Sequence, residues 1–225
     1  KARGFTACAG SGSTVVCAGG QGNGDSKHDE SFSFATDVFV LNVDGSLASH
    51  NTSHALSVGR KKLSAAAQGD VCTVANDNDP SQVVISGHKA AIERAIELVK
   101  DHGIKRGILL PVSAPFHCPL MQPAADAMAE ALSTATLLAP LVPVYANVTA
   151  APVADAETIK RLLVEQVTGR VRWRESVIAM FDAGVHDYVE FGGKVLAAMV
   201  KRSAPDATAT SIVTMDDIET LVKGL

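Results

Sequence analysis

The stretch that decides the fold is VCTVANDNDPSQVVISGHKAAIERAIELVK, residues 71–100. Two short β-rich runs, residues 71–76 and 82–87, are joined by the turn-forming sequence DNDP, and each run is predicted to be a strand. Residues 88–103 then repeat apolar side chains at helical spacing and end in glycine, which predicts a helix. Residues 106–113, RGILLPVS, are predicted to form a further strand. The order strand, hairpin, strand, helix, strand is most of a ferredoxin-like unit.

The rest of the chain divides into a regular part and an irregular part. Helices are predicted over 119–135, 155–169, 171–185 and 194–204, and strands over 142–149 and 186–193. Helices that alternate with strands indicate an α/β sheet domain. Before residue 66, only 13–18 and 37–43 have the pattern of strands, and no good amphipathic helix is found.

Composition excludes several classes of protein. The chain has 225 residues, of which 47% are hydrophobic, so it can bury the core of one sizeable domain or two small ones. A net charge of -4 disfavours a general nucleic-acid binder, because such binding requires a basic surface. The four cysteines lack the spacing of a zinc site or a disulfide framework, which favours a reducing cytoplasm. No apolar run approaches the roughly 20 residues of a membrane span, and the N-terminus lacks the apolar segment of a signal peptide.

A single histidine stands in VSAPFHCPLM, residues 112–121, just after a predicted strand. A lone His117 beside Phe116 is, in the simplest interpretation, a satisfied loop or core residue. The functional alternative is a general base, because an imidazole with a pKa near 6.5 suits proton transfer at neutral pH. A loop that follows a buried strand at a sheet edge is also where ligands usually bind.

Five segments in register resemble the bacterial malonyl-CoA:acyl carrier protein transacylase family. They are ANDNDPSQVVISG, LLPVSAPFHCPLM, VYANVTAAPV, LVEQVTGRVRWRESV and EFGGKVLAAMVKR. The resemblance implies an α/β fold, with an α/β-hydrolase-like large subdomain and an inserted ferredoxin-like small one. Residues 1–65 are then an irregular, divergent or frame-shifted part, 66–111 a partial small subdomain, and 112–225 the C-terminal part of the large subdomain.

The same resemblance implies roles for four residues. His117 matches the general base, and Gln166 matches the glutamine whose associated carbonyl orients that base. Asn76 and Asn78 match paired asparagines on the coenzyme A side of the cleft. The alternatives are a solvated helix-face amide for Gln166 and ordinary turn chemistry for the asparagines. If the chain is active, His117→Ala is expected to lower turnover about 10² to 10⁴-fold.

The nucleophile of the family has no clear counterpart. The family carries its serine in a G-H-S-x-G elbow, and no GxSxG occurs in this sequence. Ser46 in DGSLASH is the nearest imitation, and an ordinary turn serine is the simpler interpretation. Gln21 only faintly matches the family's oxyanion-hole glutamine, and Arg60 stands in VGRKKL, which does not match the segment with the malonyl-binding arginine. The chain as written is therefore predicted to form no acyl-enzyme.

The implied activity is malonyl transfer from coenzyme A to acyl carrier protein in fatty acid synthesis. Malonyl-CoA and the carrier's phosphopantetheine are then substrates, and no metal or further cofactor is expected, because a thioester is already activated. We expect a monomer in the cytoplasm that contacts neither nucleic acid nor membrane. The alternatives are a non-catalytic fragment of the same family and a module that binds acyl carrier protein without catalysis.

Overall fold

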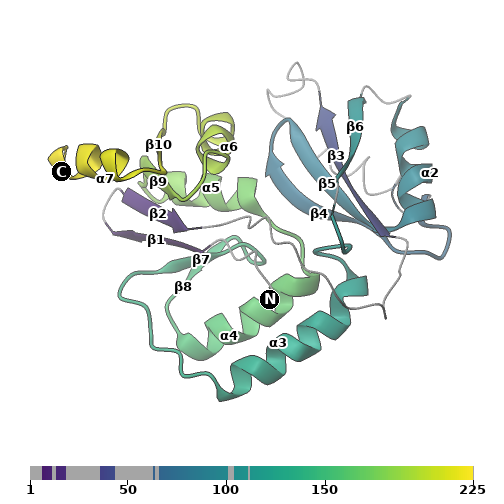
Figure 1. The fold of residues 1–225 in the computed structure, drawn as a ribbon, viewed down its shortest axis with the longest axis horizontal. Coiled ribbons are helices and arrows are strands. Elements are labelled where there is room, and N and C mark those ends of the chain that lie inside the picture. The colour runs from purple at the N-terminus through teal and green to yellow at the C-terminus, as the bar shows by residue number, and fades with distance from the viewer. Residues whose placement is uncertain are drawn as a thin grey trace.

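The computed structural model forms two sheets, each with its own helices (Figure 1). The structure describes residues 7–11, 14–18, 36–43, 63, 66–100, 104–110 and 112–224. Its mixture of helices and strands confirms the predicted α/β class.

The smaller sheet has four antiparallel strands in the order β4-β5-β3-β6. Its strands are β3 (Thr36–Val43), β4 (Cys72–Asp79), β5 (Gln82–His88) and β6 (Ile104–Leu110). Helix α2 (Lys89–Lys100) follows β5 directly and ends at the last residue of the stretch quoted above. Strand β3 lies between β5 and β6, so a segment from the irregular part of the sequence completes this sheet.

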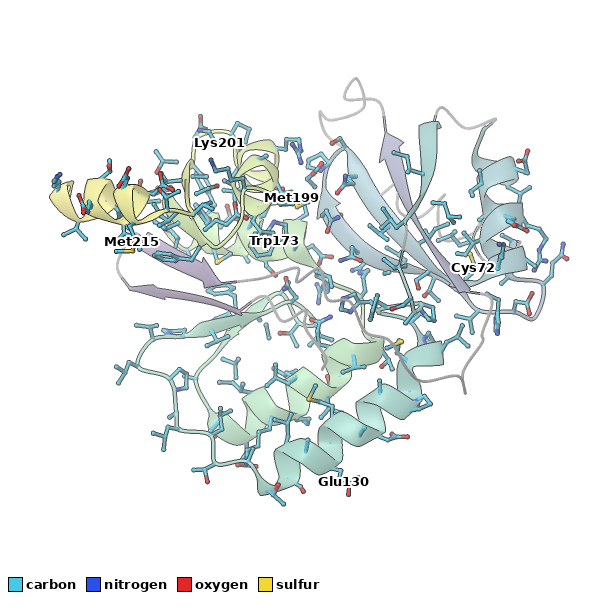
Figure 2. The ribbon with its side chains drawn as sticks, viewed as in Figure 1. Cys72, Glu130, Trp173, Met199, Lys201 and Met215 are labelled. Carbon is cyan, nitrogen blue, oxygen red and sulfur yellow. The ribbon has the colours of Figure 1, made fainter. Side chains whose placement is uncertain are left out.

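The β4–β5 hairpin and α2 form because local chemistry and burial agree. At the turn, the Asp79 carboxylate accepts hydrogen bonds from the Ser81 amide at 2.8 Å and from its hydroxyl at 2.6 Å. Ala91, Ile92 and Ala95 on the apolar face of α2 are buried, and Ile92 packs in the same cluster as Ile85 of β5. Figure 2 shows Cys72, another member of this cluster, between the sheet and α2.

The larger sheet has six strands in the order β10-β9-β2-β1-β7-β8. They are β1 (Ala7–Ser11), β2 (Thr14–Ala18), β7 (Val144–Ala146), β8 (Ala151–Val153), β9 (Asp187–Phe191) and β10 (Thr208–Ile212). The pairs β10–β9 and β9–β2 are parallel, and the remaining pairs are antiparallel.

Six helical segments accompany the larger sheet: η2 (Pro119–Met121), α3 (Gln122–Thr134), α4 (Ala156–Thr168), α5 (Trp173–Asp182), α6 (Leu196–Ser203) and α7 (Met215–Lys223). Helices α3 and α4 lie side by side below the sheet in Figure 1, whereas α5 and α6 lie above it, toward the smaller sheet. The core on that side contains Trp173, Val177 and Met180 of α5 together with Tyr188 and Val200.

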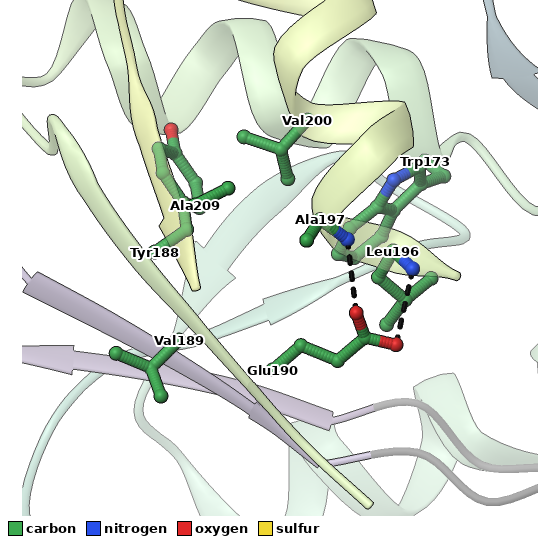
Figure 3. Close-up of a pocket in the computed structure, with 8 residues that line it drawn as sticks. All are labelled: Trp173, Tyr188, Val189, Glu190, Leu196, Ala197, Val200 and Ala209. Carbon is green, nitrogen blue, oxygen red and sulfur yellow. Dashed lines mark hydrogen bonds between the residues drawn. The ribbon is translucent and has the colours of Figure 1, made fainter. Parts of the chain in front are cut away.

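The turn between β9 and α6 is held by one buried carboxylate. Glu190 accepts hydrogen bonds from the backbone amides of Val195, Leu196 and Ala197 at 2.9, 3.1 and 3.0 Å. Figure 3 shows the bonds from Leu196 and Ala197. These amides are donors that the first turn of a helix leaves without intrahelical partners, and an anion there also interacts favourably with the helix dipole. The Glu190 carboxylate thus caps the start of α6.

The predicted strand over residues 142–149 is only partly correct. The structure has the shorter strand β7, a turn, and then β8, which pairs back on β7. The turn ends at Ala150, whose φ of +53° reverses the chain direction. Strand β1, strand β10 and helix α7 were not predicted.

Candidate active site

His117 lies on the loop between β6 and η2, in a backbone conformation that aims its ring at α4. Its φ is +59°, in the left-handed region that non-glycine residues seldom adopt. The ring Nδ1 is 2.9 Å from the backbone oxygen of Gln166. A carbonyl oxygen only accepts, so in the neutral ring Nδ1 carries the proton and Nε2 keeps its lone pair. This is the tautomer that a general base requires.

Burial favours the neutral form of this ring. Burial lowers the pKa of His117 from 6.5, because the charged imidazolium would lose its contact with water. Hydrogen bonds to the backbone of Gln166 and Gly169 act in the opposite direction, but the effect of burial is larger. His117 is therefore neutral near pH 7 and ready to accept a proton at Nε2.

Gln166 acts through its backbone, and its side chain supports the turn behind it. The residue lies in the last turn of α4, where carbonyl groups have no intrahelical partner, so its oxygen is free for His117. Its side-chain Nε2 donates to the backbone oxygen of Gly169 at 2.9 Å. The amide is half-buried and bonded to backbone, which differs from the solvated helix-face alternative.

Gly169 lies next to the candidate site, at a position that sequence reasoning did not single out. A Cβ there would lie 2.7 Å from the Glu165 backbone oxygen and 2.9 Å from Val148 Cγ2, so only glycine fits without a shift of the turn. The signal was present, because glycine is common directly after a helix and was read only as a helix end.

Asn76 and Asn78 lie on β4, half-buried, and alternate with the buried Asp77 and Asp79. The Asn78 side chain donates from Nδ2 to Gln82 Oε1 at 2.9 Å across the hairpin, a contact of the kind that turn chemistry predicts. The backbone at Asn76 forms a parallel bridge with Val171, which lies five residues after Gln166. Segment 169–172 thus connects β4 to the helix end that orients His117.

Cys118 is the candidate nucleophile next to His117 whose placement the structure describes. Cys118 is fully buried, and its thiol donates to the Pro115 backbone oxygen at 3.0 Å. Burial also raises its pKa, which keeps it as an unreactive thiol. Ser46, Gln21 and Arg60 lie outside the described residues.

Two further structural observations bear on cofactors and membranes. Within the described part of the chain, no group of three or more His, Cys, Asp and Glu side chains is arranged to hold a metal ion. No helix in the same part is long and apolar enough to cross a membrane.

Comparison with known proteins supports the resemblance found in the sequence. The family model described as "Acyl transferase domain" matches residues 41–215. The malonyl CoA-acyl carrier protein transacylase of Escherichia coli O157:H7 is 44% identical over 157 residues, which are 69% of this chain and 50% of that protein. The Synechocystis enzyme of the same name is 38% identical over 149 residues, 66% of this chain and 50% of its own length.

Solved structures agree with the sequence matches. The acyl-carrier-protein-S-malonyltransferase of Bartonella henselae superposes with a TM-score of 0.75 at 40% identity, covering 85% of this chain and 58% of that one. A malonyl-transacylase in complex with a type II PKS acyl-carrier protein superposes with a TM-score of 0.76 at 32% identity, covering 85% and 59%. The predicted acyltransferase fold is confirmed by these neighbours.

The chain spans about half the length of the curated relatives it matches. Within that span, the family model covers most of the chain, from the end of β3 to the start of α7. These matches show that the chain belongs to the acyl transferase family.

Proposed function

We propose that this chain supplies the general base and the coenzyme A side of a site that transfers malonyl from coenzyme A to acyl carrier protein. The observation that carries the proposal is the 2.9 Å contact from His117 Nδ1 to the Gln166 backbone oxygen, which leaves Nε2 free to accept a proton. The malonyl group, coenzyme A and the carrier protein are inferred from the names of the relatives.

In the proposed chemistry His117 moves one proton in each half-reaction. Nε2 takes the proton of a serine hydroxyl as its oxygen attacks the malonyl thioester, and returns that proton to the coenzyme A sulfur as the C–S bond breaks. In the second half-reaction, Nε2 takes the proton of the pantetheine thiol as its sulfur attacks the serine ester. The proton then goes to the departing serine oxygen. The serine is the one implied by the family resemblance.

A neutral carbonyl as the hydrogen-bond acceptor of His117, in place of a carboxylate, suits this reaction. A carbonyl stabilises the imidazolium less than a carboxylate does, but a thioester is a more reactive acyl donor than an amide. The Gln166 oxygen therefore has to fix the tautomer and direction of the ring, and both follow from a single hydrogen bond.

Asn76 and Asn78 are proposed to contact coenzyme A, and the carrier's phosphopantetheine is proposed as the acceptor. No metal or additional cofactor takes part in this scheme, since the thioester is already activated. We further propose a monomer that acts in the cytoplasm without nucleic acid or membrane. The net charge of -4 supports the exclusion of nucleic acid.

The binding half of the proposal is tested on the chain itself by titration calorimetry with coenzyme A and with malonyl-CoA. The wild type is expected to bind both, and the double variant Asn76→Ala, Asn78→Ala is expected to bind at least about tenfold more weakly, as for the loss of two polar contacts. Gln122→Ala, which removes an exposed amide on α3, serves as the matched control. Equal binding by the double variant would contradict the assignment of the two asparagines.

The catalytic half is tested in a chimera that joins the N-terminal half of the Escherichia coli K12 relative to residues 66–225 of this chain. The chimera is expected to transfer malonyl to holo-acyl carrier protein, and His117→Ala is expected to lower its turnover about 10² to 10⁴-fold with unchanged circular dichroism. Retained turnover would reject His117 as the base. Loss of folding together with activity would favour a structural role instead.

A further inference from the structure

Strand β4 carries two buried carboxylates that the proposed reaction does not use. Asp77 is 1% exposed and Asp79 is 2% exposed, and along β4 they alternate with the half-buried Asn76 and Asn78. A buried carboxylate without a partner is strongly unfavourable, so each must be matched by a charge from another element.

The partner of Asp77 lies on α5, one of the helices that accompany the larger sheet. Arg174, in the first turn of α5, donates from Nε to Asp77 Oδ1 at 2.9 Å and from Nη2 to Oδ2 at 2.7 Å. This is a two-pronged, charge-assisted contact, which fixes direction as well as distance. Arg174 is itself only 8% exposed, so the pair is shielded from water and salt.

Backbone hydrogen bonds reinforce this contact at one point. The Asp77 amide donates to the Val171 oxygen and the Val171 amide donates to the Ala75 oxygen, both at 2.8 Å. The two backbone bonds join β4 to Val171 of segment 169–172, and the ion pair joins β4 to α5, which begins at the next residue after that segment.

Segment 169–172 is the one that supports the base. Its first residue, Gly169, accepts the Gln166 side chain, and the Gln166 backbone oxygen receives His117 Nδ1. Hydrogen bonds and the backbone of residues 169–171 therefore connect β4 to the Gln166 oxygen that the His117 ring contacts.

We propose that Asp77 and Arg174 form a positioning pair, which holds the small subdomain against segment 169–172 and thereby fixes the direction of the His117 ring. Neither residue is catalytic. The consequence for coenzyme A binding rests on the proposed function, whereas the geometric effect on His117 does not.

The same strand offers a matched control. Asp79 is paired with Arg202 of α6, with Nε at 2.9 Å and Nη2 at 2.8 Å from Oδ2. Among the described residues, neither partner of this pair hydrogen-bonds to segment 169–172. Arg174→Met and Arg202→Met each leave one buried carboxylate of β4 without its arginine. Only Arg174→Met removes the ion pair of the aspartate whose backbone is bonded to Val171.

The test measures hydrogen exchange of the His117 Nδ1 proton by nuclear magnetic resonance in the full chain. In the wild type and in Arg202→Met this proton is expected to exchange slowly, and in Arg174→Met at least about tenfold faster, because its acceptor is no longer held. Coenzyme A binding by calorimetry is expected to weaken about tenfold in Arg174→Met alone.

Two results overturn the proposal: exchange in Arg174→Met that matches the wild type, or equal acceleration in Arg202→Met. If Arg174→Met does not fold, Arg174→Lys decides, since lysine keeps the charge and loses the two-pronged geometry. Faster exchange than the wild type then supports the proposal, and unchanged exchange rejects it. A wild type that binds no coenzyme A but shows the exchange difference would reject the proposed function and leave the positioning pair intact.

Discussion

At the scale of single residues, the site depends on a backbone angle that a sequence pattern does not show. His117 adopts a φ of +59°, and this left-handed turn directs Nδ1 toward the end of α4. Such conformations are unfavourable for non-glycine residues and persist where the surroundings enforce them, which is common at functional sites. The sequence identified the residue, whereas only the fold shows how its tautomer is set.

The titration of His117 is the first prediction at this scale. Burial lowers its pKa in the folded chain below 6.5, while the unfolded chain keeps the ordinary value. Between the two values the unfolded chain binds more protons, so the free energy of unfolding falls as the solution is acidified below 6.5. His117→Gln removes this contribution, so we expect its stability to fall less between about pH 8 and about pH 5 than that of the wild type.

Urea unfolding at the two pH values, with a nuclear magnetic resonance titration of the imidazole, measures this difference. His186→Gln is a suitable control, because that ring packs edge-on against Phe181, near the C-terminal end of α5. A midpoint for His117 at or above 6.5 would contradict the structural account of the base.

At the scale of elements, the turn after α4 is expected to be sensitive to a single added methyl group. Gly169→Ala places a Cβ against the Glu165 oxygen and Val148, so the turn has to move and the Gln166 side chain loses its acceptor. We expect a loss of about 1–3 kcal/mol in the free energy of unfolding, as for overpacking of a close contact. The His117 Nδ1 proton should also exchange faster.

Gly224→Ala provides the comparison, since a Cβ there meets its nearest atom at an ordinary 3.5 Å. Urea titration of both variants and the wild type measures the stability change. If Gly169→Ala were as stable as Gly224→Ala with an unchanged His117 signal, the turn would not be the support that the hydrogen bonds indicate.

Elements with strong local signals were predicted well. The β4–β5 hairpin and α2 have β-rich runs, a turn and an amphipathic stripe within one stretch, and all three were found within a few residues of their expected bounds. The strand at 37–43 was also found, although its partners in the sheet could not be foreseen, because pairing joins segments far apart in the chain. Helix α7 was missed even though Thr214 and Asp217 form a capping box at its start.

At the scale of the whole molecule, the connection between the two sheets is the feature least visible in the sequence. The sequence around Asp77 is typical of an exposed turn. In the structure, however, Asp77 is buried and paired with Arg174, which lies 97 positions further along the chain. No local periodicity marks a pair at that separation. The candidate site residues could therefore be proposed from motifs, while the Asp77–Arg174 pair could not.

The last prediction is that this chain, incubated with malonyl-CoA, forms no acyl-enzyme. A hydroxyl becomes a nucleophile only when a base lies within hydrogen-bond reach and donors await the oxyanion. The sequence has no GxSxG elbow, and Ser11 ends a strand that pairs with the next strand along the chain, where an elbow would lead into a helix. Cys118 is the remaining candidate beside His117, and its buried thiol already donates to Pro115. Intact-mass measurement after incubation with radiolabelled malonyl-CoA tests this, with the Escherichia coli relative as the positive control. We expect an adduct on the control alone. A stoichiometric adduct mapped to a serine of this chain would refute the prediction and identify its nucleophile.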